Sequence, residues 1–213
     1  MLEYELTLHH TGLILWGDRA ALERLYGFVG HVVDESHIIE DKEGFVLGLC
    51  YDLRKAFEGH RENRWRFEGT EDQCRIYGVK ILWPVLLIQM SLLRRAMGSI
   101  PTNRHDQAIM YELEHVVESA LRAATPATAD DVLHASFRAG TASYTHIETL
   151  LDSRCYYFIK LSAKERQHVL AKLMETFDPV YQSLAEVGAI LRPGIIPPSA
   201  FLGSRQEWPD FEW

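Results

Sequence analysis

Two Glu-x-x-His pairs come nearer to a metal site than any other residues of this sequence. They are Glu112 with His115 and Glu165 with His168. Residues three apart share one face of a helix, and helical proteins that bind two iron or manganese ions use two such pairs with further carboxylates. These ligands must point into the interior of a helical bundle. The hydrophobic pattern around each pair therefore decides whether a site can form.

Both pairs fail this requirement. His115 and His168 each point to the side of their helix opposite the apolar residues. Glu165 has another role, because Ser162 and Glu165 have the spacing of a capping box. The apolar segment 82–97, which should lie inside the protein, has no acidic residue. We therefore expect solvated helix faces, no metal site and no cofactor.

The remaining candidates for catalysis are weaker. Adjacent residues of a strand point to opposite faces, so His9 and His10 are poorly placed to chelate one ion. Asp34 and His37 form a pair with no further ligand nearby. The glycine-rich phosphate and dinucleotide loops and the nucleophile elbow are absent. A catalytic triad needs no fixed spacing, so the identity of any catalytic residue is unknown at this stage.

The charge of the chain disfavours nucleic acid as a partner. The 213 residues carry a net charge of −8 and have a pI near 5.7, and such a surface repels phosphate. One short segment has the composition of a base-stacking surface, namely Arg61, Arg64, Trp65, Arg66 and Phe67. Glu62 and Glu68 dilute its charge, so we interpret it as a solvated sheet face.

Cysteine usage and hydropathy indicate a cytoplasmic protein. Cys50, Cys74 and Cys155 are far apart and form no Cys-x-x-Cys pair, as expected of reduced thiols. The acidic start of the sequence does not resemble a secretory signal. The longest nearly apolar stretch, 81–93, is shorter than the roughly 20 residues that cross a bilayer. We expect no membrane association.

Alternation of apolar and polar residues predicts two β-hairpins. One spans residues 2–16 with its turn at Thr11-Gly12, and the other spans 64–79. The two hairpins could join into one small antiparallel sheet. Apolar residues at helical spacing predict helices at 19–35, 44–58, 82–97, 103–124, 128–138, 145–158 and 163–177, and a further short helix is expected after Asp178. Asp18 is the predicted N-cap of the first of these helices, and Thr102 is the predicted N-cap of the helix that ends at Ala124. Gly98 is the expected C′ residue of the apolar helix. The predicted fold class is α+β, predominantly α, with the hairpins packed on a helical bundle around that central apolar helix.

The last part of the chain has a different composition. Prolines interrupt it from Pro193 onwards, and three large aromatic residues stand near its end: Trp208, Phe211 and Trp213. We divide the chain into a single globular domain, 1–191, and a tail, 192–213, that we expect to dock on this domain. Exposed tryptophans often dominate interfaces, so the three aromatic residues are also candidates for binding a partner.

The chain resembles a family of uncharacterised bacterial proteins of about this length. The resemblance rests on the segments MLEYELTLHHTGLILWGD, EGFVLGLCYDLRKAFEG, YGVKILWPVLLIQ, IPTNRHDQAIMYELEHVVESAL and WPDFEW. It implies a bacterial, cytoplasmic protein with one domain, and it assigns no functional residue.

Two hypotheses on function follow from these observations. The first is a binding or accessory protein, for example one that neutralises a toxin or belongs to a defence system. Its basis is the acidic charge, the lack of catalytic motifs and the aromatic tail. The second is an enzyme whose active site lies in a cleft between the sheet and the helices. The sequence leaves the oligomeric state open.

Overall fold

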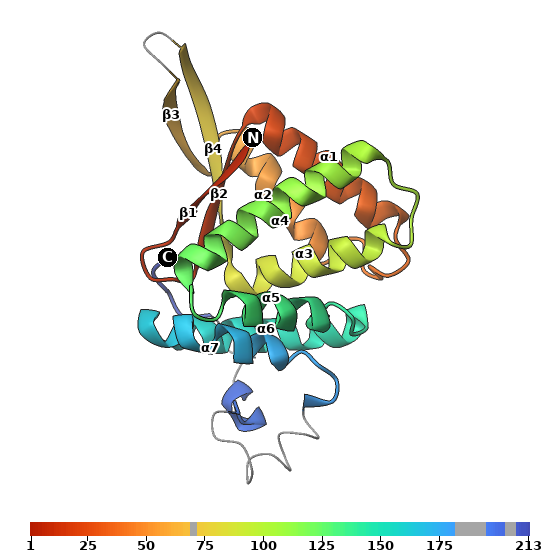
Figure 1. The fold of residues 1–213 in the computed structure, drawn as a ribbon, viewed down its shortest axis with the longest axis vertical. Helices are drawn as coiled ribbons and strands as arrows, with labels where there is room; N and C mark the ends of the chain where they lie inside the picture. The colour runs from red at the N-terminus through yellow and green to blue at the C-terminus, as the bar shows by residue number, and fades with distance from the viewer. Residues whose placement is uncertain (69–71, 182–194, 203–207) are drawn as a thin grey trace.

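The fold combines one antiparallel sheet with a helical bundle (Figure 1). A computed structural model describes residues 1–68, 72–181, 195–202 and 208–213. The strands are β1 (Leu2–Leu6), β2 (Gly12–Asp18), β3 (Glu62–Glu68) and β4 (Asp72–Leu82). The helices are α1 (Arg19–Glu35), α2 (Phe45–Phe57), α3 (Trp83–Met97), α4 (Arg104–Ala124), α5 (Ala129–Ala139), α6 (Tyr144–Lys160), α7 (Ala163–Glu175) and the 3₁₀ helix η1 (Pro198–Phe201). The predicted α+β class with a helical majority is confirmed.

The two predicted hairpins join into one sheet. Its strand order is β1-β2-β4-β3, and all three neighbouring pairs are antiparallel. The contact between hairpins is the β2–β4 pair, in which Leu13 lies opposite Ile81 and Leu15 opposite Val79. These four residues are buried because the helices cover this face of the sheet. β1 and β3 are therefore the edge strands.

The turn of the first hairpin differs from the prediction. It spans residues 7–11, and Gly12 already belongs to β2. His10 adopts a left-handed conformation with φ 55°. Gly12 is needed for space, because a Cβ there would lie 1.9 Å from the Ile81 carbonyl oxygen. Leu8, which continues the alternation in the sequence, lies in the turn and is exposed.

Helix α3 lies at the centre of the fold, as its apolar sequence predicts. Twelve of its 15 residues are buried, and Leu87 is inaccessible to solvent. Sheet and helices α1, α2 and α4 pack on one side of α3, and α5, α6 and α7 pack on the other (Figure 1). Gly98 is the C-cap of α3 in a right-handed conformation, φ −71°, so the predicted C′ role is wrong.

The cap of α4 also differs from the prediction. Asn103, not Thr102, is the N-cap, and its side chain accepts hydrogen bonds from the amides of His105 and Asp106. The Asp106 carboxylate accepts the Asn103 amide in return, which completes a capping box. The predicted caps Asp18 and Ser162 are confirmed.

Two expectations fall on residues outside the described ranges. The short helix after Asp178 would continue into 182–194, and the division between domain and tail at 191–192 lies in the same gap. Among the helices that the structure does describe, none combines the length and the hydropathy that a membrane span requires.

Candidate functional site

The edge strand β1 presents different chemistry on its two faces. Leu2, Tyr4 and Leu6 face the helices and pack on the core. Glu3 and Glu5 face outward, opposite Trp16 and Ile14 of β2. This alternation follows from the period of two in a strand. One edge of the sheet therefore carries apolar groups on one side and carboxylates on the other.

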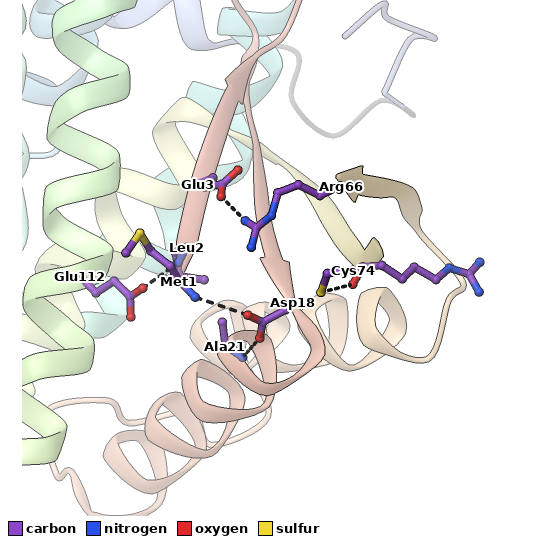
Figure 2. Close-up of polar contacts among 9 residues, drawn as sticks. Met1, Leu2, Glu3, Asp18, Ala21, Arg66, Cys74 and Glu112 are labelled. Atoms are coloured by element: carbon purple, nitrogen blue, oxygen red, sulfur yellow. Dashed lines mark hydrogen bonds and ion pairs between the residues drawn. The ribbon is translucent and has the colours of Figure 1, made fainter. Parts of the chain in front are cut away.

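Helix α4 runs beside β1 and contacts it through Glu112. The Glu112 Oε1 atom accepts a hydrogen bond of 2.7 Å from the Leu2 amide (Figure 2). A side chain thus satisfies an amide that no neighbouring strand reaches. Glu112 is half-buried and His115 is exposed. Glu112 therefore has a structural contact rather than the fully solvated position that the sequence suggested.

Between β1 and α4 lies a groove of about 640 Å³. We call it the β1 groove and define it by its lining residues Met1, Leu2, Glu3, Tyr4, Glu112, His115, Val116 and Ser119. This volume is in the range of sites that hold a small molecule or several side chains. The lining includes two carboxylates and a histidine but no lysine or arginine. The groove is therefore suited to apolar or positively charged groups.

The outward face of the sheet carries an ordered array of charges. Arg64 of β3 donates to Glu5 at 2.6 Å. Arg66 of β3 donates to Glu3, as Figure 2 shows. The Arg64 guanidinium lies 4.2 Å from the Trp16 ring centroid and helps to bury Trp16, which is 5% exposed on the outward face of the sheet. The arginines that the sequence marked for nucleic-acid stacking thus form ion pairs, and Arg61 also pairs with Asp52.

Asp18 anchors the end of β2 to both β1 and α1. Its Oδ1 atom accepts the Ala21 amide at 2.7 Å, and its Oδ2 atom lies 3.5 Å from the Met1 amino group (Figure 2). Burial opposes ionisation, but the Ala21 hydrogen bond and nearby positive groups outweigh it and lower the pKa of Asp18. This carboxylate fixes the start of β1 and hence one end of the β1 groove.

The second Glu-x-x-His pair lies away from the groove. Glu165 closes the capping box of α7 through the amide and hydroxyl of Ser162. His168 is exposed, and its Nδ1 atom lies 2.7 Å from the Lys164 carbonyl. Asp34 and His37 are exposed as well. Within the described residues no group of three or more histidine, cysteine, aspartate or glutamate side chains is arranged to hold a metal ion.

The histidines of the first turn have separate partners. His9 Nε2 lies 3.0 Å from Glu212, and the ring of His10 contacts the Gln167 amide. The three thiols are free, with Cys50 and Cys155 buried and Cys74 half-buried. Burial raises the pKa of Cys50 to about 12, which makes its thiolate a minor species.

The aromatic residues near the end of the chain contact the domain. Phe211 and Trp213 are half-buried and pack against the core, with ring centroids 5.1 Å apart. Trp208 is more exposed, and its Nε1 donates to Asp152 of α6 at 2.8 Å. Trp213 also lines a second groove of about 470 Å³, together with Lys80 and other residues of β4, Asp52 of α2 and Val85 of α3. Whether any of the three aromatic residues binds a partner stays a prediction.

The sequence contained only part of the signal for the β1 groove. Alternation in residues 2–6 shows that one face of the strand is buried, and the helical stripe of α4 shows which face packs inward. Neither pattern shows that β1 is an edge strand or that α4 lies beside it. The groove residues Tyr4, Val116 and Ser119 were for this reason not among the predicted site residues.

The fold and groove define an α+β domain with a helix-lined edge strand and a mostly apolar groove beside it. The chain belongs to a family described as a domain of unknown function, DUF6904, whose model matches residues 2–213. No curated protein and no solved structure matches the chain.

Proposed function

We propose that this protein is a binding or accessory protein that holds a protein partner in the β1 groove. The observation that carries the proposal is the groove itself, with apolar walls from Leu2 and Val116 beside an edge strand. Grooves at sheet edges are a recurrent docking place for segments of other proteins. We further propose a bacterial, cytoplasmic setting, in which neutralising a toxin or serving a defence system are roles of this kind.

Charge supports the same proposal. The net charge of −8 favours encounter with a basic protein, because complementary fields accelerate association and suppress wrong partners. Glu3 and Glu112 add carboxylates at the groove itself. A nucleic acid would meet repulsion at this place.

Site-specific photocrosslinking in cells that produce this protein tests the proposal. A photoreactive residue at Ser119 lies in the groove, and one at exposed Tyr111 of α4, which does not line the groove, serves as the control. We expect a discrete crosslinked species from position 119 that is absent from position 111. A His115→Trp substitution should weaken it, because His115 is an exposed residue of the lining and the larger side chain occupies the groove. Equal crosslinking at both positions, or none at 119, contradicts the proposal.

An enzyme is the second candidate, and one observation favours it. Glu112, His115 and Ser119 line the same groove from one helix, so an acid, a base and a hydroxyl share one surface. Two observations argue against catalysis. The Glu112 carboxylate accepts a hydrogen bond from the Leu2 amide, and within the described residues His115 and Ser119 are not hydrogen-bonded to each other. If the groove is catalytic, any hydrolytic activity found should fall by at least about a hundredfold in His115→Ala; partner crosslinking should not depend on that change.

A further inference from the structure

The main chain of β1 has hydrogen-bonding groups that no neighbouring strand uses. The Thr7 amide donates to the Gly12 carbonyl, whereas the Leu2 amide points to Glu112 on the other side. Because amides alternate along a strand, those of Glu3 and Glu5 point toward β2, and those of Tyr4 and Leu6 point away from it. Within the described residues, the amides and carbonyls of Tyr4 and Leu6 have no hydrogen-bond partner. The outer edge of β1 is therefore open for pairing from Tyr4 onward.

We propose that the partner in the β1 groove supplies an extended segment that pairs with β1 as a fifth strand. In this segment, apolar residues alternate with lysine or arginine. This inference rests on the proposed function and specifies the partner's chemistry. Exposed edges readily accept strands from other chains, with the main chain providing affinity and alternate side chains providing specificity.

The two faces of β1 determine the alternation. Side chains of an added strand that face inward would lie over the β1 groove, beside Tyr4 and Val116, and therefore need to be apolar. Side chains that face outward would lie opposite Glu3 and Glu5, whose side chains are 40% and 46% exposed. The ion pairs with Arg64 and Arg66 reach these carboxylates from β3, so the side toward the added strand stays accessible. Opposite charges in directly facing positions stabilise a strand pair.

The same charges disfavour a second copy of this chain as the occupant. A two-fold antiparallel pairing of β1 with itself around Tyr4 would place Glu3 opposite Glu5 of the other copy, and like charges in facing positions are destabilising. The other edge strand, β3, carries Arg64 and Arg66 beside Glu62 and Glu68, and the two arginines pair with Glu5 and Glu3, so β3 favours a basic segment less than β1 does. Preference for a basic over an acidic segment therefore distinguishes pairing of a partner at β1 from pairing of two copies through β1 and from pairing at β3.

The test uses two synthetic ten-residue peptides, one alternating lysine with valine and one alternating glutamate with valine. Fluorescence anisotropy measures their binding to the full chain. We expect the lysine peptide to bind at least tenfold more tightly than the glutamate peptide. Glu3→Gln together with Glu5→Gln should weaken the lysine peptide several-fold and reduce the dependence of its Kd on salt.

A main-chain substitution separates strand pairing from side-chain docking. Tyr4→Pro removes an amide that β2 does not use, and Tyr4→Ala removes the same side chain but keeps the amide. We expect Tyr4→Pro to bind the lysine peptide at least tenfold more weakly than Tyr4→Ala. Since Tyr4→Pro could fail to fold, a lysine peptide N-methylated at every second residue provides the same test on the wild-type protein. One of its two methylation registers should abolish binding, because a strand pairs through alternate amides.

The outcomes distinguish this inference from the proposed function. If the lysine peptide binds but neither proline nor N-methylation affects it, the segment docks through side chains; strand pairing is then wrong and the partner-binding groove stands. If the two peptides bind equally, or if Trp65→Ala on β3 abolishes binding while Tyr4→Pro does not, the inference is overturned. Concentration-dependent dimers of the wild-type chain that Tyr4→Pro disperses would identify a second copy as the occupant and also overturn it.

Discussion

Arg166 of α7 is the residue whose replacement tests the packing of the fold most directly. Its side chain is almost fully buried and donates from Nε to the Phe158 carbonyl at 3.1 Å and from Nη1 to the His9 carbonyl at 2.8 Å. Nη2 donates to the Ile159 carbonyl at 2.5 Å. One guanidinium thus joins the last turn of α6 to the turn between β1 and β2. A positive charge at this place also suits the negative end of the α6 dipole.

The expected cost of Arg166→Met follows from these three hydrogen bonds. Each contributes about 1–1.5 kcal/mol, which sums to about 3–4.5 kcal/mol, and the methionine retains part of the apolar packing. Burial opposes the charged form and lowers the pKa of Arg166, so the loss should lie at the lower end of this range. We predict a decrease of about 3 kcal/mol in the free energy of unfolding, or about 10 °C in Tm for a chain of this size.

Urea denaturation followed by circular dichroism measures the change, with the m-value as a check on two-state behaviour. Arg122→Met is the matched control, because Arg122 is exposed and its ion pairs with Glu118 and Asp130 lie at the surface; we expect a change much smaller than that of Arg166→Met. Amide exchange in residues 7–11 should accelerate in Arg166→Met alone, since the contact with the His9 carbonyl is lost. A loss no larger than that of Arg122→Met would refute the stabilising role of these bonds.

Four further predictions concern the core, the caps and the tail. Leu87→Asp should abolish folding and Leu87→Ala should cost about 2–5 kcal/mol, because Leu87 lies inside the central helix; unchanged thermal melts would show that α3 is not central. Asn103→Ala should cost about 0.5–2 kcal/mol in urea titrations through loss of the α4 capping box, whereas Thr102→Ala should cost much less. The folded-state pKa of Asp18 is depressed, so its contribution is complete above the unfolded value of about 3.9 and is lost as the pH falls; Asp18→Asn should therefore destabilise at pH 7 and have a smaller effect near pH 2. Deleting residues 205–213 should lower Tm by an amount that matches a few kcal/mol, because Phe211 and Trp213 pack on the core; an unchanged midpoint would mean that the tail does not stabilise the domain.

The sequence alone predicted most of the local structure. Alternation placed the strands of both hairpins, and the apolar stripe together with the Asp18 cap predicted α1 to the residue. The mostly apolar composition of 82–97, which has no acidic residue, identified α3 as central. These features depend on contacts between residues two to four apart, which a sequence pattern records directly. The errors were also local. The observed first turn and the observed α4 cap lie one or a few residues from the predicted positions, because several neighbouring residues are suited to form a turn or a cap.

The sheet order and everything that depends on it were decided by the tertiary structure. Pairing of β2 with β4, about 65 residues apart in sequence, leaves β1 at an edge and leaves its Tyr4 amide open. Arg166 is one of several charged residues in a polar stretch of sequence, yet its partner carbonyl at His9 is 157 positions away and makes it a buried link. Likewise Glu112 seemed to be a solvated residue until α4 packed beside β1. Sequence periodicity shows which side of a helix or strand is buried, because it reflects contacts between residues close in the chain. The packing of distant elements determines what that side contacts, which strand lies at an edge and where a groove forms.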